Sequence, residues 1–199
     1  GLTEQLIFSR ADRALYRAKV EGRNCYRIFD TAMDGAIIRR RELERDLRKA
    51  LAGGRLQLHY QPQVRARSGE LVGFEALLRW RHPERGAVSP AEFISLAEET
   101  GLIAQLGKWV LQTACTEAAR WTQPLKIAVN LSPREFQQDD LPDLVFAILT
   151  ETGLPPERLE IEITETAIFA DANRALSIVR RLKDAGISVA MDDFGTGYA

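Results

Sequence analysis

Side chains that carry carboxylate or amide oxygens lie in, or directly after, several apolar stretches of this sequence. The side chains in question are Glu75, Asn130, Glu162, Glu165, Asp192 and Asp193. None of them is histidine or cysteine. In parallel α/β proteins the functional groups gather where the strands end, and oxygen ligands at that place suit Mg²⁺ or Mn²⁺ better than Zn²⁺. The pattern therefore predicts a site for divalent metal ions.

The apolar surroundings of these acids strengthen that prediction. Glu162 lies between two isoleucines, and the Asp192-Asp193 pair follows an apolar stretch. A carboxylate in such a place is costly unless it is paired or binds a metal ion, and two adjacent carboxylates repel each other unless a cation lies between them. Each residue alone has a structural alternative, such as an ion pair of Glu75 with an arginine or a cap by Asn130 or Asp193. The joint placement favours a metal site.

The spacing of apolar residues predicts the elements that would hold these side chains. Leu56, Leu58 and Tyr60 alternate with polar residues, so 56–64 is expected to form a hairpin with 71–80. Helices are expected over 39–51, from Pro90, over 102–121, up to Thr152 and after Asp171. Strands are expected over 126–131, 159–163 and 187–191. Strands alternating with helices indicate a parallel sheet with right-handed crossovers, which is an α/β fold.

The first 38 residues follow a different pattern. Ala14 and Ala18 lie on one stripe of a predicted helix with Ala11 and Leu15, and 25–29 is expected to be a short strand. Thirty residues are too few to bury a core of their own. The weakly patterned segment 31–38 is interpreted as a linker.

Composition excludes several classes of protein. The chain has 199 residues, of which 45% are hydrophobic and 28% charged, with a net charge of −1. Such a chain is not wholly disordered, and it lacks the basic excess of a dedicated DNA or RNA binder. It contains no apolar stretch long enough to span a membrane and no secretion signal. Cys25 and Cys115 lack metal-ligand spacing, which favours reduced thiols and a cytoplasmic location, although an upstream membrane anchor stays compatible with it.

Several short motifs resemble one known family. They are Tyr60-Gln61-Pro62, the run Glu75-Ala76-Leu77-Leu78-Arg79-Trp80, Asn130-Leu131-Ser132, Glu162-Ile163-Thr164-Glu165, and Asp192-Asp193-Phe194-Gly195-Thr196-Gly197-Tyr198. Their order and spacing resemble the EAL-type cyclic di-GMP phosphodiesterases, bacterial signalling enzymes, over about 39–199. The segment 11–19 with Gly22-Arg23-Asn24 resembles the closing helix of a GGDEF diguanylate cyclase domain. The expected organisation is a GGDEF remnant at 1–30, a linker at 31–38 and an EAL domain at 39–199.

The resemblance implies a fold, a reaction and a set of roles. The fold would be a TIM-like barrel with an antiparallel first strand, of which this chain holds about five strands. The reaction would be hydrolysis of cyclic di-GMP to linear pGpG with two Mg²⁺ or Mn²⁺ ions. Glu75, Asn130, Glu162 and Asp192 would bind one ion, and Asp192 and Asp193 the second. Arg79 would hold a substrate phosphate, Gln61 would contact the substrate, and Glu165 would steady the loop after Asp193. Catalytic roles thus fall on Glu75, Glu165 and Asp193, and the domain could pair as a homodimer.

Two other functions stay open: a degenerate EAL domain that binds cyclic di-GMP without cutting it, and an interaction module. Every ligand that the family pattern places within this span is present, which favours the enzyme. A TIM barrel takes about 250 residues, whereas this sequence ends inside the glycine-rich loop and lacks the family's later lysine, glutamates and glutamine. The chain alone is therefore expected to be inactive and truncated. Both histidines, His59 and His82, are expected to be structural.

Overall fold

The computed structural model describes residues 3–20, 24–164, 167–168 and 171–192. The chain divides into two compact units, Gly1–Leu47 and Arg48–Ala199, which are treated separately below. All strands among the described residues belong to the second unit. None of the helices in the described ranges combines the length and the apolar character that crossing a membrane requires.

The first unit contains helix α1 (Glu4–Val20) and most of helix α2 (Thr31–Ala52). Ala14 and Ala18 are buried on α1 as predicted, whereas Leu15 is exposed. The predicted strand at 25–29 is wrong, since this segment is irregular in the structure. Tyr26 and Ile28 are 82% and 79% exposed. Alternating apolar residues form a strand only where a neighbouring strand offers hydrogen bonds.

The segment 31–38, interpreted from the sequence as a linker, is helical in the structure. It forms the beginning of α2, which starts at Thr31 rather than near Arg39. Apolar spacing missed this part because Thr31–Ile38 shows no stripe, although nothing in it stops a helix from extending. Whether the segment links two domains is a separate matter that its helical state leaves untouched.

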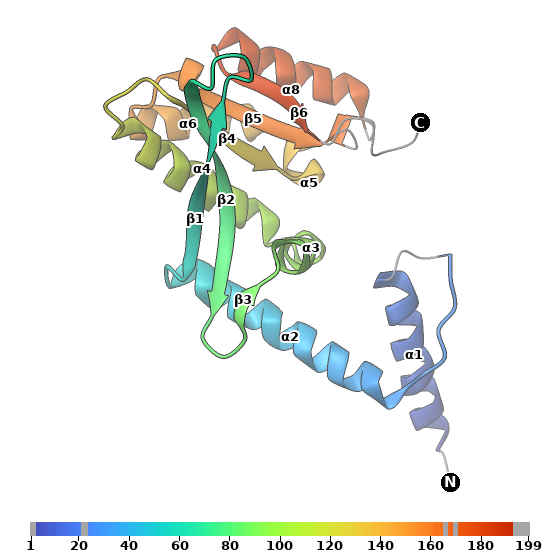
Figure 1. Cartoon of the computed structure of the whole chain (residues 1–199). Coiled ribbons are helices and arrows are strands. Elements are labelled where there is room, and N and C mark those ends of the chain that lie inside the picture. The colour runs from blue at the N-terminus through green and yellow to red at the C-terminus, as the bar shows by residue number, and fades with distance from the viewer. Residues whose placement is uncertain (1–2, 21–23, 165–166, 169–170, 193–199) are drawn as a thin grey trace. The chain divides into compact units, whose positions relative to one another are not determined.

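The second unit is built on a six-stranded sheet with the order β1-β2-β4-β5-β6, and β3 is paired to β2 (Figure 1). The strands are β1 (Leu56–Val64), β2 (Leu71–His82), β3 (Gly86–Val88), β4 (Lys126–Leu131), β5 (Leu159–Thr164) and β6 (Ser188–Asp192). β1 and β3 run antiparallel to β2, and β2, β4, β5 and β6 are parallel. This confirms the α/β fold with an antiparallel first strand. Among the described residues the sheet does not close.

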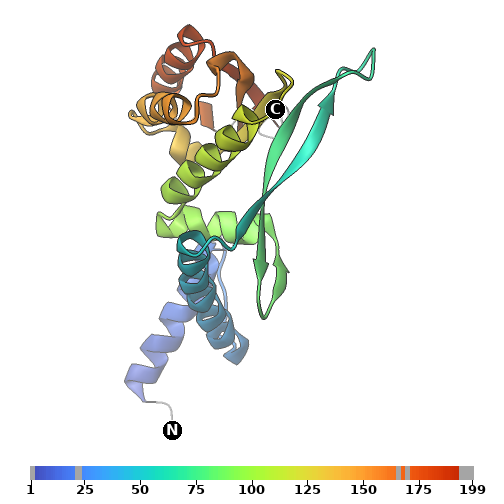
Figure 2. The ribbon, with the colours of Figure 1, turned by 90° about the vertical axis from the view of Figure 1, so that its left-hand side faces the viewer.

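Strands β1 and β2 form a long, twisted ribbon (Figure 2). Strand β3 had no sequence signal because three residues are too few to show alternation. It follows a turn in which Nδ1 of the buried His82 accepts hydrogen bonds from the backbone N–H groups of Glu84 and Arg85, at 3.1 and 3.2 Å. That contact gives His82 the structural role predicted for it.

The helices of this unit are α3 (Pro90–Thr100), α4 (Ile103–Ala119), α5 (Pro133–Phe136), α6 (Leu141–Thr152), the 3₁₀ turn η1 (Pro156–Arg158) and α8 (Ala172–Asp184). Three of the predicted ends are confirmed, whereas the helix expected over 102–121 spans Ile103–Ala119. Pro90 occupies the first position of α3, Gly153 ends α6 in the left-handed region at φ 71°, and Asp171 caps α8 by accepting from the N–H of Arg174 at 3.1 Å.

The core lies between the sheet and helices α4, α6 and α8. Alternate strand residues such as Ile127, Ile161 and Ile163 are 0–2% exposed and join Ala114 and Leu182 in one apolar cluster. Burial of each such side chain contributes about 1.5–3 kcal/mol. The residues between them in the strands point to the opposite face of the sheet, and that face carries the candidate site.

Candidate active site

The strand register brings three of the predicted metal ligands to one face of the sheet. Glu75 on β2 is opposite Ala128 on β4, and Asn130 lies two residues beyond Ala128. Asn130 is opposite Glu162 on β5. Since residues two apart share a face, Glu75, Asn130 and Glu162 all lie on the face opposite the packed core. Asn130 and Glu162 lie near the carboxyl ends of β4 and β5, and Glu75 lies on the part of β2 that pairs with β4.

The remaining acids of the predicted set are less fully described. The backbone of Asp192 ends β6 in register with Thr164, so its position continues the same series. Asp193 and Glu165 lie outside the described residues. Within the ranges that the structure describes, no three His, Cys, Asp or Glu side chains gather closely enough to hold a metal ion. The complete ligand set therefore remains a prediction.

Both carboxylates of this group, Glu75 and Glu162, accept a hydrogen bond from an amide side chain. Asn130 Nδ2 donates to Glu75 Oε1 at 2.7 Å, and Gln63 Nε2 donates to Glu162 Oε1 at 3.3 Å. Asn130 binds Glu75 through its nitrogen, so its oxygen Oδ1, the atom with which asparagine binds cations, is not used in that bond. Carboxylate and amide oxygens arranged in this way fit a hard divalent cation.

The two residues predicted to bind substrate flank this group. Gln61 on β1 is paired with Glu75, and Arg79 on β2 is paired with Gln57. The Arg79 guanidinium donates from Nη1 to the carbonyl of Leu78 at 2.9 Å. Arg79 thus lies on the same strand as Glu75, four residues nearer the end of β2 at His82.

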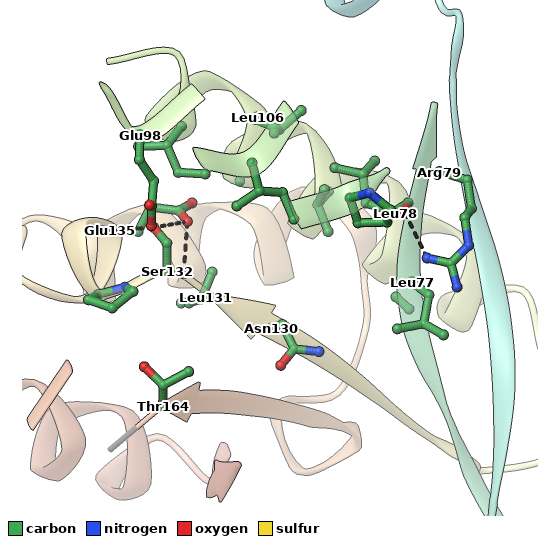
Figure 3. A pocket seen from close by; sticks show the side chains of 17 residues that line it. Leu77, Leu78, Arg79, Glu98, Leu106, Asn130, Leu131, Ser132, Glu135 and Thr164 are labelled. Carbon is green, nitrogen blue, oxygen red and sulfur yellow. Dashed lines mark hydrogen bonds between the residues drawn. The ribbon is translucent and has the colours of Figure 1, made fainter. Parts of the chain in front are cut away.

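A pocket of about 350 Å³ opens beside Asn130 and Arg79 (Figure 3). Strand β2, helices α3 and α4 and the turn after β4 supply its walls, which are mostly apolar and include Leu77, Leu106, Ser132 and Glu135. Figure 3 shows Asn130 between Arg79 on one side and Ser132 with Glu135 on the other. A mainly apolar pocket with a few polar groups at its edge is typical of small-molecule sites.

Comparison with known proteins identifies the family. The sequence profile of the EAL domain matches residues 44–199. This chain belongs to the EAL domain family. It is 55% identical over 199 residues to an uncharacterized signaling protein of Caulobacter vibrioides, covering 100% of this chain and 25% of the relative.

A second relative is the bifunctional diguanylate cyclase/cyclic di-GMP phosphodiesterase MucR of Pseudomonas aeruginosa. It is 42% identical over 203 residues, covering 100% of this chain and 30% of MucR. The solved structure of the PaMucR phosphodiesterase in complex with c-di-GMP is 44% identical, with a TM-score of 0.76, over 79% of this chain and 66% of that chain. The chain thus spans about a quarter to a third of the length of these curated relatives.

The EAL domain also holds a buried acid that the motif analysis missed, Glu135. Its Oε2 accepts from the Ser132 hydroxyl at 2.6 Å and from the Ser132 N–H at 3.0 Å. The Glu135 N–H donates in turn to the Ser132 hydroxyl oxygen at 3.4 Å, which completes a capping box at the start of α5. Burial raises the pKa of Glu135, the hydrogen bonds from Ser132 lower it, and the charge of Glu98 raises it further. The sequence carried a signal for this contact, because Ser132-Pro133-Arg134-Glu135 has capping-box spacing.

Helix α4 leaves room for that acid. A Cβ at Gly107 would lie 1.5 Å from Glu135 Oε1. The glycine is therefore required by a close approach and not by a turn. The capping box fixes the backbone of the turn that follows Asn130, so Glu135 supports the end of β4 in this EAL domain.

Proposed function

We propose that this EAL domain hydrolyses cyclic di-GMP to linear pGpG in a reaction that requires Mg²⁺ or Mn²⁺. The observation that carries the proposal is the placement of Glu75, Asn130 and Glu162 on one face of the sheet, on the neighbouring parallel strands β2, β4 and β5. The similarity to MucR, whose name includes cyclic di-GMP phosphodiesterase, supports the substrate.

Each residue has a role in this proposal. Glu75, Asn130, Glu162, Asp192 and Asp193 would hold the ions, which make water more acidic and stabilise the charge that develops on phosphate oxygens. Arg79 would hold a substrate phosphate, for which a guanidinium is suited. Gln61 lies beside Glu75 and would contact the substrate, and Glu165 would steady the loop that carries Asp193.

We also propose that residues 1–30 derive from a GGDEF-like domain. MucR matches the whole of this chain, including the part before the EAL match, and its name includes diguanylate cyclase. Pairing of EAL domains as a homodimer stays part of the proposal.

The test is turnover of cyclic di-GMP by the intact protein, with products separated by chromatography. Turnover to pGpG with Mg²⁺ or Mn²⁺ is expected, together with its loss in EDTA. Glu75→Gln and Glu162→Gln are expected to reduce the rate more than about 100-fold, because loss of a direct metal ligand should exceed the 10–100-fold effects of outer-shell changes.

The chain offers a matched control on the same strand. Glu160 lies two residues before Glu162 on β5 and contacts Lys126 Nζ at 3.4 Å, toward the opposite end of the strand. Glu160→Gln is expected to change the rate less than about threefold. Turnover without metal ions would contradict the proposal, and so would a rate for Glu160→Gln as low as that for Glu162→Gln. Tight binding of cyclic di-GMP without turnover would identify a receptor instead.

A further inference from the structure

One hydrogen bond on the polar face joins strands that are not neighbours. Gln63 on β1 donates from Nε2 to Glu162 Oε1 on β5 at 3.3 Å, although β2 and β4 lie between these strands in the sheet. Side chains of such distant strands meet only where the sheet curves strongly. The polar face of the second unit is therefore concave, and Gln63 reaches across it.

Local features of β1 and β2 open the path for this side chain. Gln63 is paired with Gly73, and the register of β1 shifts between Gln63 and Val64. Such bulges re-aim side chains. Gly73 contributes no side chain, and a Cβ there would lie 2.6 Å from the carbonyl oxygen of Lys126. Gly73 itself therefore places no side chain in the way of Gln63.

The donors on this face differ in charge along the strands. Lys126, a cation, contacts Glu160 Oε2 at 3.4 Å and the Ser188 hydroxyl at 3.0 Å. Glu162, two residues later, receives a hydrogen bond from the neutral amide of Gln63. A neutral amide donor orients a carboxylate without itself adding a positive charge. Outer-shell groups of this kind fix the geometry of metal ligands.

We propose that Gln63 is a positioning residue for the metal ion held by Glu162. By binding Oε1, the Gln63 amide sets the orientation of the carboxylate, so that Glu162 presents a fixed oxygen to a divalent cation. Asn130 does the same for Glu75 through its own amide nitrogen. The inference rests on the proposed function for the presence of the ion, and it adds a residue outside the family's motifs.

The test measures Mn²⁺ affinity of the intact protein by titration calorimetry, in addition to the Mn²⁺ dependence of turnover. Gln63→Leu is expected to weaken Mn²⁺ binding about 10-fold or more, within the range for outer-shell changes. Gln63→Asn keeps an amide but shortens its reach, so it is expected to weaken binding as well. Gln105→Leu, an exposed substitution on α4, is the matched control and should leave affinity unchanged.

Further readouts separate a positioning role from other roles. At saturating Mn²⁺ the KM of Gln63→Leu for cyclic di-GMP is expected to stay within twofold of wild type, and the metal-free variants should unfold at the wild-type temperature. Unchanged Mn²⁺ affinity in both Gln63 variants, or a KM that rises at saturating Mn²⁺, would overturn the inference.

The proposed function fails separately. A wild-type protein that binds Mn²⁺ without turning over cyclic di-GMP contradicts the hydrolase, while its Mn²⁺ affinity still tests Gln63. A wild-type protein that binds no Mn²⁺ contradicts both.

Discussion

The two faces of the central sheet are made by alternate residues of the same strands, yet one face packs against helices and the other carries polar side chains. Ile161 is fully buried against the helices, whereas the next residue, Glu162, faces the other way and contacts Gln63. On β4, Val129 and Asn130 show the same contrast. The packed core and the proposed metal ligands are thus separated by one residue along a strand.

Packing explains why the polar face tolerates charged groups. A parallel sheet is normally covered on both faces and reads as a continuous apolar run. Here helices α4, α6 and α8 pack on one face, and the opposite face carries polar side chains that bond to each other across strands, as Lys126 does with Glu160. Small residues such as Ala128 lie between them. This face therefore has space between its polar side chains, as the proposed site requires.

The comparison predicts that neighbouring substitutions on β5 differ in their effects on stability and on turnover. Ile161→Ala is expected to lower the free energy of unfolding by about 2–5 kcal/mol, because it leaves a cavity in the core. Glu162→Ala removes a partly exposed side chain, and we expect it to lower the free energy of unfolding by less than about 1 kcal/mol while abolishing turnover. Urea denaturation of the metal-free protein measures both. Equal losses of stability would show that the two faces are not separated.

A smaller effect tests a place on the core side where a carboxyl group is buried. Gly107→Ala would improve helix propensity, but its Cβ would collide with Glu135 Oε1. We expect a net loss of about 1–3 kcal/mol, as for other overpacked sites. The loss should disappear when Glu135 is also replaced by alanine, because the added methyl group then meets no oxygen. An equal loss in both backgrounds would contradict this account of the glycine.

Local signals in the sequence were enough to predict the strands that hold Asn130 and Glu162. The isoleucines beside Glu162 were interpreted as its apolar surroundings, whereas in the structure they face the opposite side of β5 and are buried in the core. The strands of β4, β5 and β6 and the caps at Pro90, Gly153 and Asp171 followed from equally local signals.

Contacts made by tertiary structure were not predictable in this way. The bond from Gln63 to Glu162 depends on sheet curvature and on a bulge, neither of which the sequence pattern reveals. The segment 25–29 has strand-like residues but no neighbouring strand, and it is irregular for that reason. Glu135 lies on α5 and not at the end of a strand, so the pattern of acids at strand ends did not predict it. Its capping-box spacing with Ser132 was the available signal.

The smallest expected effect concerns the pH dependence that Glu135 gives to stability. Burial raises the pKa of Glu135 above its ordinary value of 4.5, so the folded state holds this proton more tightly than the unfolded state. The stability that follows from the shift is fully present below pH 4.5 and is lost as the pH rises through the raised value. Glu135→Gln is neutral throughout, and its amide oxygen still accepts from Ser132. The free energy of unfolding of the variant minus that of wild type should therefore rise between pH 4 and pH 7.

Urea denaturation at a series of pH values measures that difference. Other charged groups near Glu135 are the same in the variant and in the wild type. Glu98 adds a negative charge nearby, and Arg134 donates to the Glu98 carbonyl, so both remain unchanged in the comparison. Glu151→Gln, at an exposed position on α6, is the matched control, and its curve should run parallel to wild type. A difference for Glu135→Gln that stays flat or falls with pH would mean that the acid is ionised at little cost. The core side would then accept charge as readily as the polar face does.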